Sequence, residues 1–221
     1  MNDKQLTGNV LENFFLNPEV PKKICTFQRG EYLFREGYPT DKIYYILQGK
    51  VKICINNANG RSLLVCFLHR HSVLGEIEAF LDNTAFTTVQ AVTSLECICI
   101  SSKTLYDAAL SDTELMLSIT KILAYRSQYS IRNASLNILC TAEERVCSYI
   151  AETNIDGIFS ENLSELCDML GTSYRHLHRT LVRLCEMNIL RKIAYGYEIV
   201  DSEELERISA GKYGAYGKYN F

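Results

Sequence analysis

Residues 163–190 read LSELCDMLGTSYRHLHRTLVRLCEMNIL, and this stretch predicts two helices joined by a short turn. Leucines recur at helical spacing on both sides of Gly171, so each half carries one apolar face. Glycine suits the positive φ that such a turn needs, and Asn162 and Ser173 are residue types that cap helix N-termini. The pattern is typical of a helix-turn-helix, and residues 189–200 predict a short hairpin after it.

The outer face of the second helix is basic near its N-terminal end. Arg175, His178 and Arg179 lie opposite the leucines, with Tyr174 beside them. A helix in the major groove presents its N-terminal residues to base edges, and arginine can bind guanine through two hydrogen bonds. We therefore predict that this segment binds DNA. The alternative is an ordinary solvated helix face.

The N-terminal half of the chain has a different periodicity. Residues 3–16 are amphipathic and predict a helix. From about residue 25 to 100, short alternating runs rich in β-branched and aromatic residues are separated by turn residues, which is typical of a β-sandwich or barrel. Asn59-Gly60 predicts a tight hairpin turn between two of these runs.

From about Ser102 the period is helical, and one stripe keeps a 4-3 spacing that predicts a dimer seam of coiled-coil type. Its members are Leu115, Ile119, Ile122, Arg126, Tyr129, Asn133, Leu136 and Cys140. Polar residues in a seam cost stability but fix register and partner number. The alternative is one helix lying on its own β domain. Thr141 and Glu144 fit a capping box, so we expect a new helix and a domain boundary there.

Composition excludes several classes of protein. The chain has 221 residues, is 47% hydrophobic and 22% charged, and carries a formal net charge of −3, values of an ordinary globular protein. We see no signal peptide and no apolar run of membrane-spanning length, so we expect a cytoplasmic protein without membrane contact. It contains no GxSxG, HExxH or phosphate-loop motif, so we expect no enzyme and assign no catalytic residue.

The nine cysteines are scattered and include no Cys-x-x-Cys pair, which does not describe a disulfide framework. Most of them stand at apolar positions of the periodic pattern, as core thiols do. We assign no metal ligand, although cysteines from distant segments could still converge on a metal or an iron–sulfur cluster. Cys97 and Cys99 share one strand face and are the best redox candidates, with core packing as the simpler interpretation.

The chain resembles the Crp/Fnr family of bacterial transcription regulators, and within it YeiL-like members. Residues 163–190 with their hairpin resemble its winged-helix domain, residues 29–53 (RGEYLFREGYPTDKIYYILQGKVKI) its β-roll, and residues 73–80 (VLGEIEAF) its short cassette helix. The resemblance implies an α+β fold. It has a cyclic-nucleotide-binding-type β-roll (double-stranded β-helix), a long dimerisation helix and a C-terminal winged helix-turn-helix.

The resemblance also implies domains and partners. We expect a sensor β-roll at 1–110, a dimerisation helix at 111–140, a DNA-binding domain at 141–210 and a Gly/Tyr-rich tail at 211–221. A homodimer would bind a pseudo-palindromic operator in double-stranded DNA, with RNA polymerase as a further partner. The family's DNA-contacting positions fall on Thr172, Ser173, Tyr174, Arg175, His178 and Arg179. Members often carry a glutamate where Arg175 stands, so the half-site should differ from their usual one.

The effector is not named by the sequence, and no cofactor is assigned. In members that bind cyclic AMP, a Gly-Glu pair and an Arg-Ser pair form the pocket. Gly75 and Glu76 preserve the first pair, but Ala85 and Phe86 replace the second, and no arginine lies between residues 70 and 126. Because the phosphate would lack a charged partner, we expect an effector other than cyclic AMP.

Three alternatives stay open for a member of this fold. It could respond to a cyclic nucleotide, to haem bound by His69 or His71, or to an iron–sulfur cluster. The N-terminal cysteine group of Fnr-type oxygen sensors is absent, since only Cys25 precedes Cys54.

Overall fold

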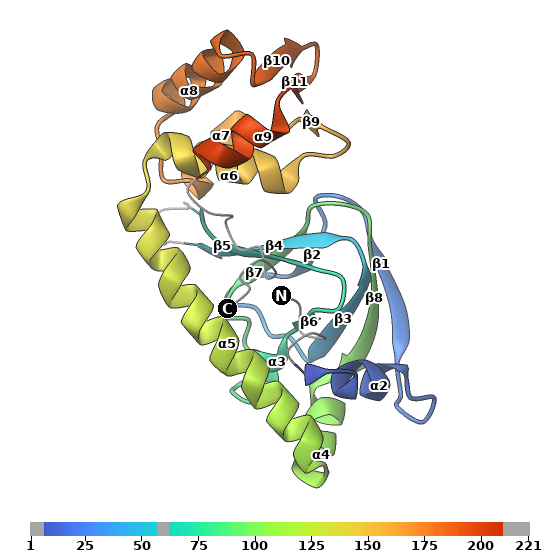
Figure 1. Ribbon diagram of the computed structural model, residues 1–221. Coiled ribbons are helices and arrows are strands. Elements are labelled where there is room, and N and C mark those ends of the chain that lie inside the picture. Colours follow the sequence, from blue (N-terminus) through green and yellow to red (C-terminus); the bar gives the residue numbers. More distant parts are fainter. Residues whose placement is uncertain (1–6, 57–61, 210–221) are drawn as a thin grey trace. The chain divides into compact units, whose positions relative to one another are not determined.

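The computed structural model describes residues 7–56 and 62–209 (Figure 1). The chain divides into two compact units. The first contains the described residues up to 55 and from 66 to 131, and the second contains the others. The predicted turn at Asn59-Gly60 and the predicted tail at 211–221 lie outside the described residues.

Two four-stranded sheets lie mostly in the first unit, as the alternating runs predicted, and only Asn56 and residues 62–65 of their strands belong to the second. One sheet has the order β1 (Lys23–Phe27), β8 (Leu95–Ser101), β3 (Lys42–Gln48), β6 (Val73–Leu74). The other has the order β2 (Tyr32–Phe34), β7 (Thr88–Ala91), β4 (Lys50–Asn56), β5 (Ser62–His69). The α+β class and the β-roll are thereby confirmed.

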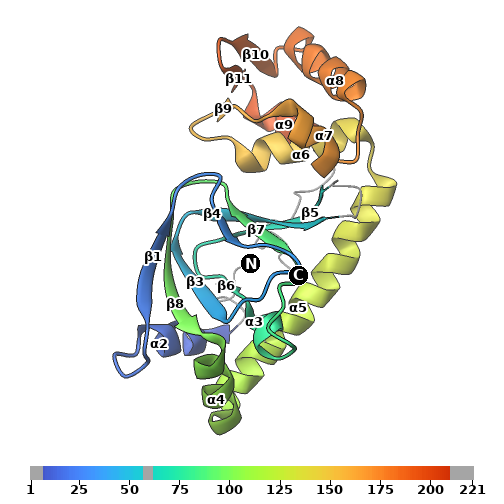
Figure 2. The same cartoon turned by 180° about the vertical axis from the view of Figure 1, so that it is seen from behind.

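Helices cover one face of the first sheet. They are α2 (Val10–Leu16), α4 (Ser102–Ser111) and the first turns of α5 (Thr113–Leu139), gathered together in Figures 1 and 2. Phe15 of α2 stacks on Tyr45 of β3 at a ring distance of 4.9 Å. Ile98, Ile100 and Leu105 complete this core. Each such side chain contributes about 1.5–3 kcal/mol when fully buried.

The same core corrects the predicted dimer seam. Leu115, Ile119 and Ile122 are at most 3% exposed and pack in the core of their own unit. The alternative interpretation, a helix lying on its own β domain, therefore holds for the first half of α5, because spacing defines a stripe but not the surface that it faces. Arg126 is also turned inward, onto Glu76. The side chains of Tyr129, Asn133 and Leu136 lie outside the described residues.

The predicted helix at 3–16 is also interrupted. Gly8 has a φ of +62°, and residues 8 and 9 form a turn before α2 begins at Val10. A left-handed residue cannot continue a right-handed helix. No described helix is both long and apolar enough to cross a membrane.

The second unit is a helical domain with a small sheet. Its helices are α6 (Ala142–Thr153), α7 (Leu163–Met169), α8 (Tyr174–Glu186) and α9 (Ser202–Ile208). Its strands are β9 (Ile158–Phe159), β10 (Leu190–Ile193) and β11 (Gly196–Ile199), in the order β10-β11-β9. The predicted capping box is confirmed, since the Thr141 hydroxyl accepts the Glu144 N–H at 3.2 Å and the Glu144 carboxylate accepts the Thr141 N–H at 2.6 Å.

Candidate nucleic-acid interface and effector region

Helices α7 and α8 form the predicted helix-turn-helix. The Asn162 side chain accepts the Ser164 N–H at 3.0 Å before α7, and Gly171 has a φ of +57° in the turn. The Ser173 hydroxyl accepts the His176 N–H at 3.2 Å and so caps α8. The leucines of α8, at 177, 181 and 184, are buried. These contacts fix which face of α8 points outward.

The outer face of α8 carries the residues expected to contact DNA. Tyr174, Arg175, His178 and Arg179 are all exposed, and the Tyr174 ring stacks on His178 at 6.4 Å. Among the described residues, neither arginine forms an ion pair. Both guanidinium groups are therefore available to a ligand.

Three other polar groups near this face are already engaged. Arg183, one turn further along α8, binds Glu143 of α6 at 3.0 Å. The backbone N–H of Thr172 donates to the Cys167 carbonyl at 3.0 Å, and the Ser173 hydroxyl serves as the cap. The structure thus brings all six predicted residues to the start of α8, with Thr172 and Ser173 partly committed to local bonds.

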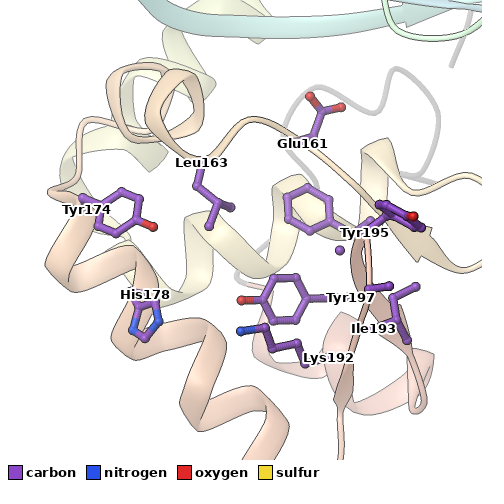
Figure 3. Close-up of a pocket in the computed structure, with 11 residues that line it drawn as sticks. Glu161, Leu163, Tyr174, His178, Lys192, Ile193, Tyr195 and Tyr197 are labelled. Carbon is purple, nitrogen blue, oxygen red and sulfur yellow. The ribbon is translucent and has the colours of Figure 1, made fainter.

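A groove of about 290 Å³ lies between α8 and the β10–β11 hairpin (Figure 3). Tyr174 and His178 line it from α8, and Lys192, Tyr195 and Tyr197 line it from the hairpin. Burial, and then the proximity of Cys185 and Tyr174, raise the pKa of the Tyr197 phenol, so it stays a protonated donor at neutral pH.

Neither Lys192 nor Tyr197 is among the site residues predicted from the sequence. Strand alternation could have found them. Leu190 is buried, and Lys192 stands two residues later on the same face of β10.

The predicted effector region centres on the short helix α3 (Glu76–Ala79). Gly75 precedes it with a φ of +88°, and a Cβ there would lie 2.5 Å from the Lys42 carbonyl oxygen, so glycine is required. Glu76 is 2% exposed, and its carboxylate binds the guanidinium of Arg126. Arg126 Nη2 also donates to the Val73 carbonyl at 2.7 Å. An arginine of α5 thus occupies the predicted site.

The predicted pair Ala85 and Phe86 lies close to a second carboxylate. Ala85 is buried, the Phe86 side chain is exposed, and the Phe86 N–H donates to the Glu78 carboxylate at 3.0 Å. Glu78 is itself 4% exposed. The Glu78 side chain therefore holds the backbone at the position where the resemblance places a ligand phosphate. This partner could not be predicted from the sequence, because the contact joins Glu78 of α3 to a loop residue eight positions later.

The candidate redox thiols are buried. Cys25 of β1 lies directly opposite Cys97 of β8, and Cys99 follows two residues later. Burial, reinforced by the neighbouring thiols, raises the pKa of Cys97 to about 12 and that of Cys99 to about 11. These thiols stay protonated at neutral pH, which supports the interpretation as core residues. No group of three or more His, Cys, Asp or Glu side chains in the described part of the chain is arranged to hold a metal ion.

The two candidate haem ligands, His69 and His71, do not lie on one strand. β5 ends at His69, and His71 lies in the following turn with a φ of +66°. His71 Nδ1 is 2.9 Å from the Tyr45 hydroxyl and 3.5 Å from the Glu12 carboxylate. The His71 ring is thus held by side chains of its own unit.

The chain is similar in sequence to a known domain family and to regulatory proteins of bacteria. Residues 24–112 match the family described as cyclic nucleotide-binding domain. Over 196 residues the chain is 23% identical to the regulatory protein YeiL of Escherichia coli O157:H7, covering 89% of this chain and 90% of that protein. It is 24% identical over 191 residues to a CRP-like cAMP-activated global transcriptional regulator of Mycobacterium tuberculosis, covering 82% and 85%.

Solved structures share the fold. FixK2 of Bradyrhizobium japonicum matches with a TM-score of 0.68 and 18% identity, over 87% of this chain and 99% of that chain. A CRP-family transcriptional regulator of Thermus thermophilus matches with a TM-score of 0.69 and 16% identity, over 86% and 99%.

Proposed function

We propose that the chain is a transcription regulator of the Crp/Fnr family, which binds double-stranded DNA through α8 as a homodimer controlled by an effector. The exposed outer face of α8, with two arginines that have no ion pair in the described part of the chain, carries this proposal. We propose a regulator rather than an enzyme, acting in the cytoplasm, with RNA polymerase as a further partner.

Arg175 and Arg179 are proposed to read bases. They lie one turn apart on a capped helix, so both side chains can reach one stretch of major groove. Each should contribute about 1–3 kcal/mol to operator binding and set the preference at one position of the half-site. Thr172 and Ser173 would contact phosphate at the N-terminus of α8, and Tyr174 and His178 would complete the face.

Alanine variants test this proposal. A duplex recovered from a randomised pool by the wild-type protein serves as the probe in an electrophoretic shift assay. Arg175→Ala and Arg179→Ala should weaken binding by roughly tenfold to a hundredfold. Arg183→Ala is the matched control, because Arg183 is paired with Glu143. Unchanged affinity of both test variants, or an equal loss in the control, would exclude this role for α8.

The proposed dimer uses a face of α5 other than the predicted stripe. Leu117, Ala124 and Ile131 recur every seven residues and are exposed, at 53% for Leu117 and 68% for Ile131. A heptad of apolar residues on an exposed helix face is what a two-helix seam needs. Leu117→Glu and Ile131→Glu should give monomers in sedimentation equilibrium, whereas Ser130→Glu should stay dimeric. A monomeric wild-type protein would refute the dimer.

We further propose that the effector is not a cyclic nucleotide. The Glu78 carboxylate already accepts the Phe86 N–H, and Arg126 is engaged by Glu76. A cyclic phosphate would have to displace one buried carboxylate without gaining a free guanidinium. Calorimetry with cyclic AMP and cyclic GMP should show no heat at millimolar ligand. A binding isotherm would establish the alternative, and an absorption spectrum of the purified protein would reveal haem or an iron–sulfur cluster.

A further inference from the structure

A second pocket lies within the first unit, between the end of β2 and the start of β3. Its volume is about 250 Å³, and all the residues that line it lie between Leu33 and Tyr44. The four residues of the predicted effector region, Gly75, Glu76, Ala85 and Phe86, are not part of this lining. The pocket is therefore separate from the place where the resemblance puts a cyclic nucleotide.

The pocket contains a buried tyrosine whose hydroxyl has no protein partner. Ile43 and Tyr45 pack in the core under the helices, so Tyr44 between them points to the opposite face of β3. Its ring stacks on Phe34 of β2 at a ring distance of 6.5 Å and meets Phe27 edge-on at 5.8 Å. Tyr44 is 4% exposed, and its hydroxyl forms no hydrogen bond with any residue that the structure describes. A buried hydroxyl without an acceptor costs stability, which indicates that a ligand supplies the acceptor.

Two exposed cations belong to the same lining. Arg35 directly follows β2, and its guanidinium carbon lies 4.0 Å from the centre of the Tyr32 ring. Such stacking fixes the plane of the guanidinium and leaves the N–H groups at its edge available. Lys42 stands two residues before Tyr44 and therefore on the same face of β3. In the described part of the chain, neither Arg35 nor Lys42 forms an ion pair.

The remaining charges and the volume narrow the chemistry of the ligand. Asp41 is the acidic residue of the lining, so the two cations outnumber it. Burial, and then the neighbouring thiols and Asp41, raise the pKa of the Tyr44 phenol, which stays a protonated donor at neutral pH. Three donors beside the apolar side chains of Leu33 and Phe34 suit a carboxylate attached to an apolar body. The volume lies below the range of about 300–1,000 Å³ that is typical of drug-sized ligands, so the ligand must be small.

We propose that this pocket binds a small organic carboxylate with an apolar body. Arg35 and Lys42 pair with the carboxylate, and the Tyr44 hydroxyl donates a hydrogen bond to it. The pocket is also connected to the loop of the predicted effector region. The Gly37 N–H donates to the Ala85 carbonyl at 2.8 Å, and the Ala85 N–H donates to the Tyr38 carbonyl at 3.0 Å. Ligand binding should therefore slow hydrogen exchange in both loops.

Two carboxylates and their neutral amides test the proposal. Benzoate, hexanoate, benzamide and hexanamide are added to the full-length protein, and binding is measured by saturation-transfer NMR and by thermal shift. At least one carboxylate should bind with a Kd of roughly 1 mM or lower, and its amide at least about tenfold more weakly. Hydrogen exchange with the bound carboxylate should be slower in residues 33–44 and 83–86.

Two variants and a matched control assign the binding residues. Arg35→Gln and Tyr44→Phe should each weaken carboxylate binding about tenfold. Lys23→Gln is the control, because Lys23 is an exposed cation of β1 outside the lining and its loss should change nothing. Tyr44→Phe should keep the wild-type melting temperature without ligand, because the hydroxyl that it removes has no protein partner.

Several results would overturn the proposal. No binding of either carboxylate at 10-fold the expected Kd excludes the site, and equal binding of acid and amide excludes the role of the cations. An equal loss in Lys23→Gln, or slower exchange only outside residues 33–44, places binding elsewhere. If Tyr44→Phe unfolds, the exposed Arg35 still decides the question. None of these results bears on DNA binding by α8, which the electrophoretic assay tests separately.

Discussion

Replacement of Arg126 by methionine should strongly destabilise the first unit. Arg126 extends from α5 to α3, and its side chain is 12% exposed, while that of Glu76 is 3% exposed. Methionine keeps the length and the apolar stem of arginine but removes the charge. The Glu76 carboxylate would then remain buried without its cation, and the Val73 carbonyl would lose the donor that now lies 2.7 Å away.

The expected cost follows from that burial. Removing one partner of a buried ion pair typically costs about 3–5 kcal/mol, whereas replacing both partners by neutral residues is often nearly neutral. For a unit of this size, a loss of about 3–5 kcal/mol corresponds to a fall in melting temperature of roughly 10–20 °C. The double variant Glu76→Gln/Arg126→Met should recover most of this loss, because no charge then stays buried.

Thermal and urea unfolding of the wild type, both single variants and the double variant form a complete cycle. The reasoning requires a coupling energy of at least about 2 kcal/mol between the two positions. It would be refuted if the free energy of unfolding of Arg126→Met lies within about 1 kcal/mol of the wild-type value, or if the double variant is less stable than Arg126→Met. Either result would mean that the pair is solvated or that α5 does not need this contact.

Three further predictions concern the second unit and the buried thiols. Gly196→Ala should cost more than about 2 kcal/mol in urea unfolding, because its Cβ would overlap a backbone oxygen of β9. Gly157 also has a left-handed backbone, but a Cβ there would meet no neighbouring atom, so Gly157→Ala should cost only about 1 kcal/mol. Equal losses of stability in the two variants would contradict this reasoning. Ser173→Ala should cost about 1 kcal/mol and lower hydrogen-exchange protection in the first turn of α8; unchanged protection would exclude a role as cap. Burial raises the pKa of both Cys97 and Cys147 from 9.0 to about 12, so their stabilising effect is complete below about pH 9 and lost as the pH rises toward 12. The free energy of unfolding in urea should fall between neutral pH and about pH 11, and the fall should be smaller in Cys97→Ala. A free energy of unfolding that does not change over this pH range would contradict the prediction.

Local signals predicted much of this fold. The capping box at Thr141, the cap at Ser173 and the hairpin after α8 each depend on residues a few positions apart, and the structure contains all three. The two-residue strand β9 was missed because it exists only through its pairing with β11, far along the chain. Helix α9 was missed as well, although Asp201 accepts the Glu204 N–H at 2.9 Å and is a residue type that caps helices.

The spacing of the predicted seam does not say which surface the stripe faces, but the charge of one of its residues does. A 4-3 stripe says only that one face of α5 is continuous, and both a partner helix and the chain's own sheet can cover such a face. Arg126 distinguishes these two arrangements. In a parallel homodimer, a seam residue faces its own copy, so two Arg126 guanidinium groups would repel each other in a buried place. Within one chain, the same arginine can meet a carboxylate, and Glu76, fifty residues earlier, supplies it. A charged residue in an apolar stripe therefore argues for contact with a different segment, which is where the structure places the first half of α5.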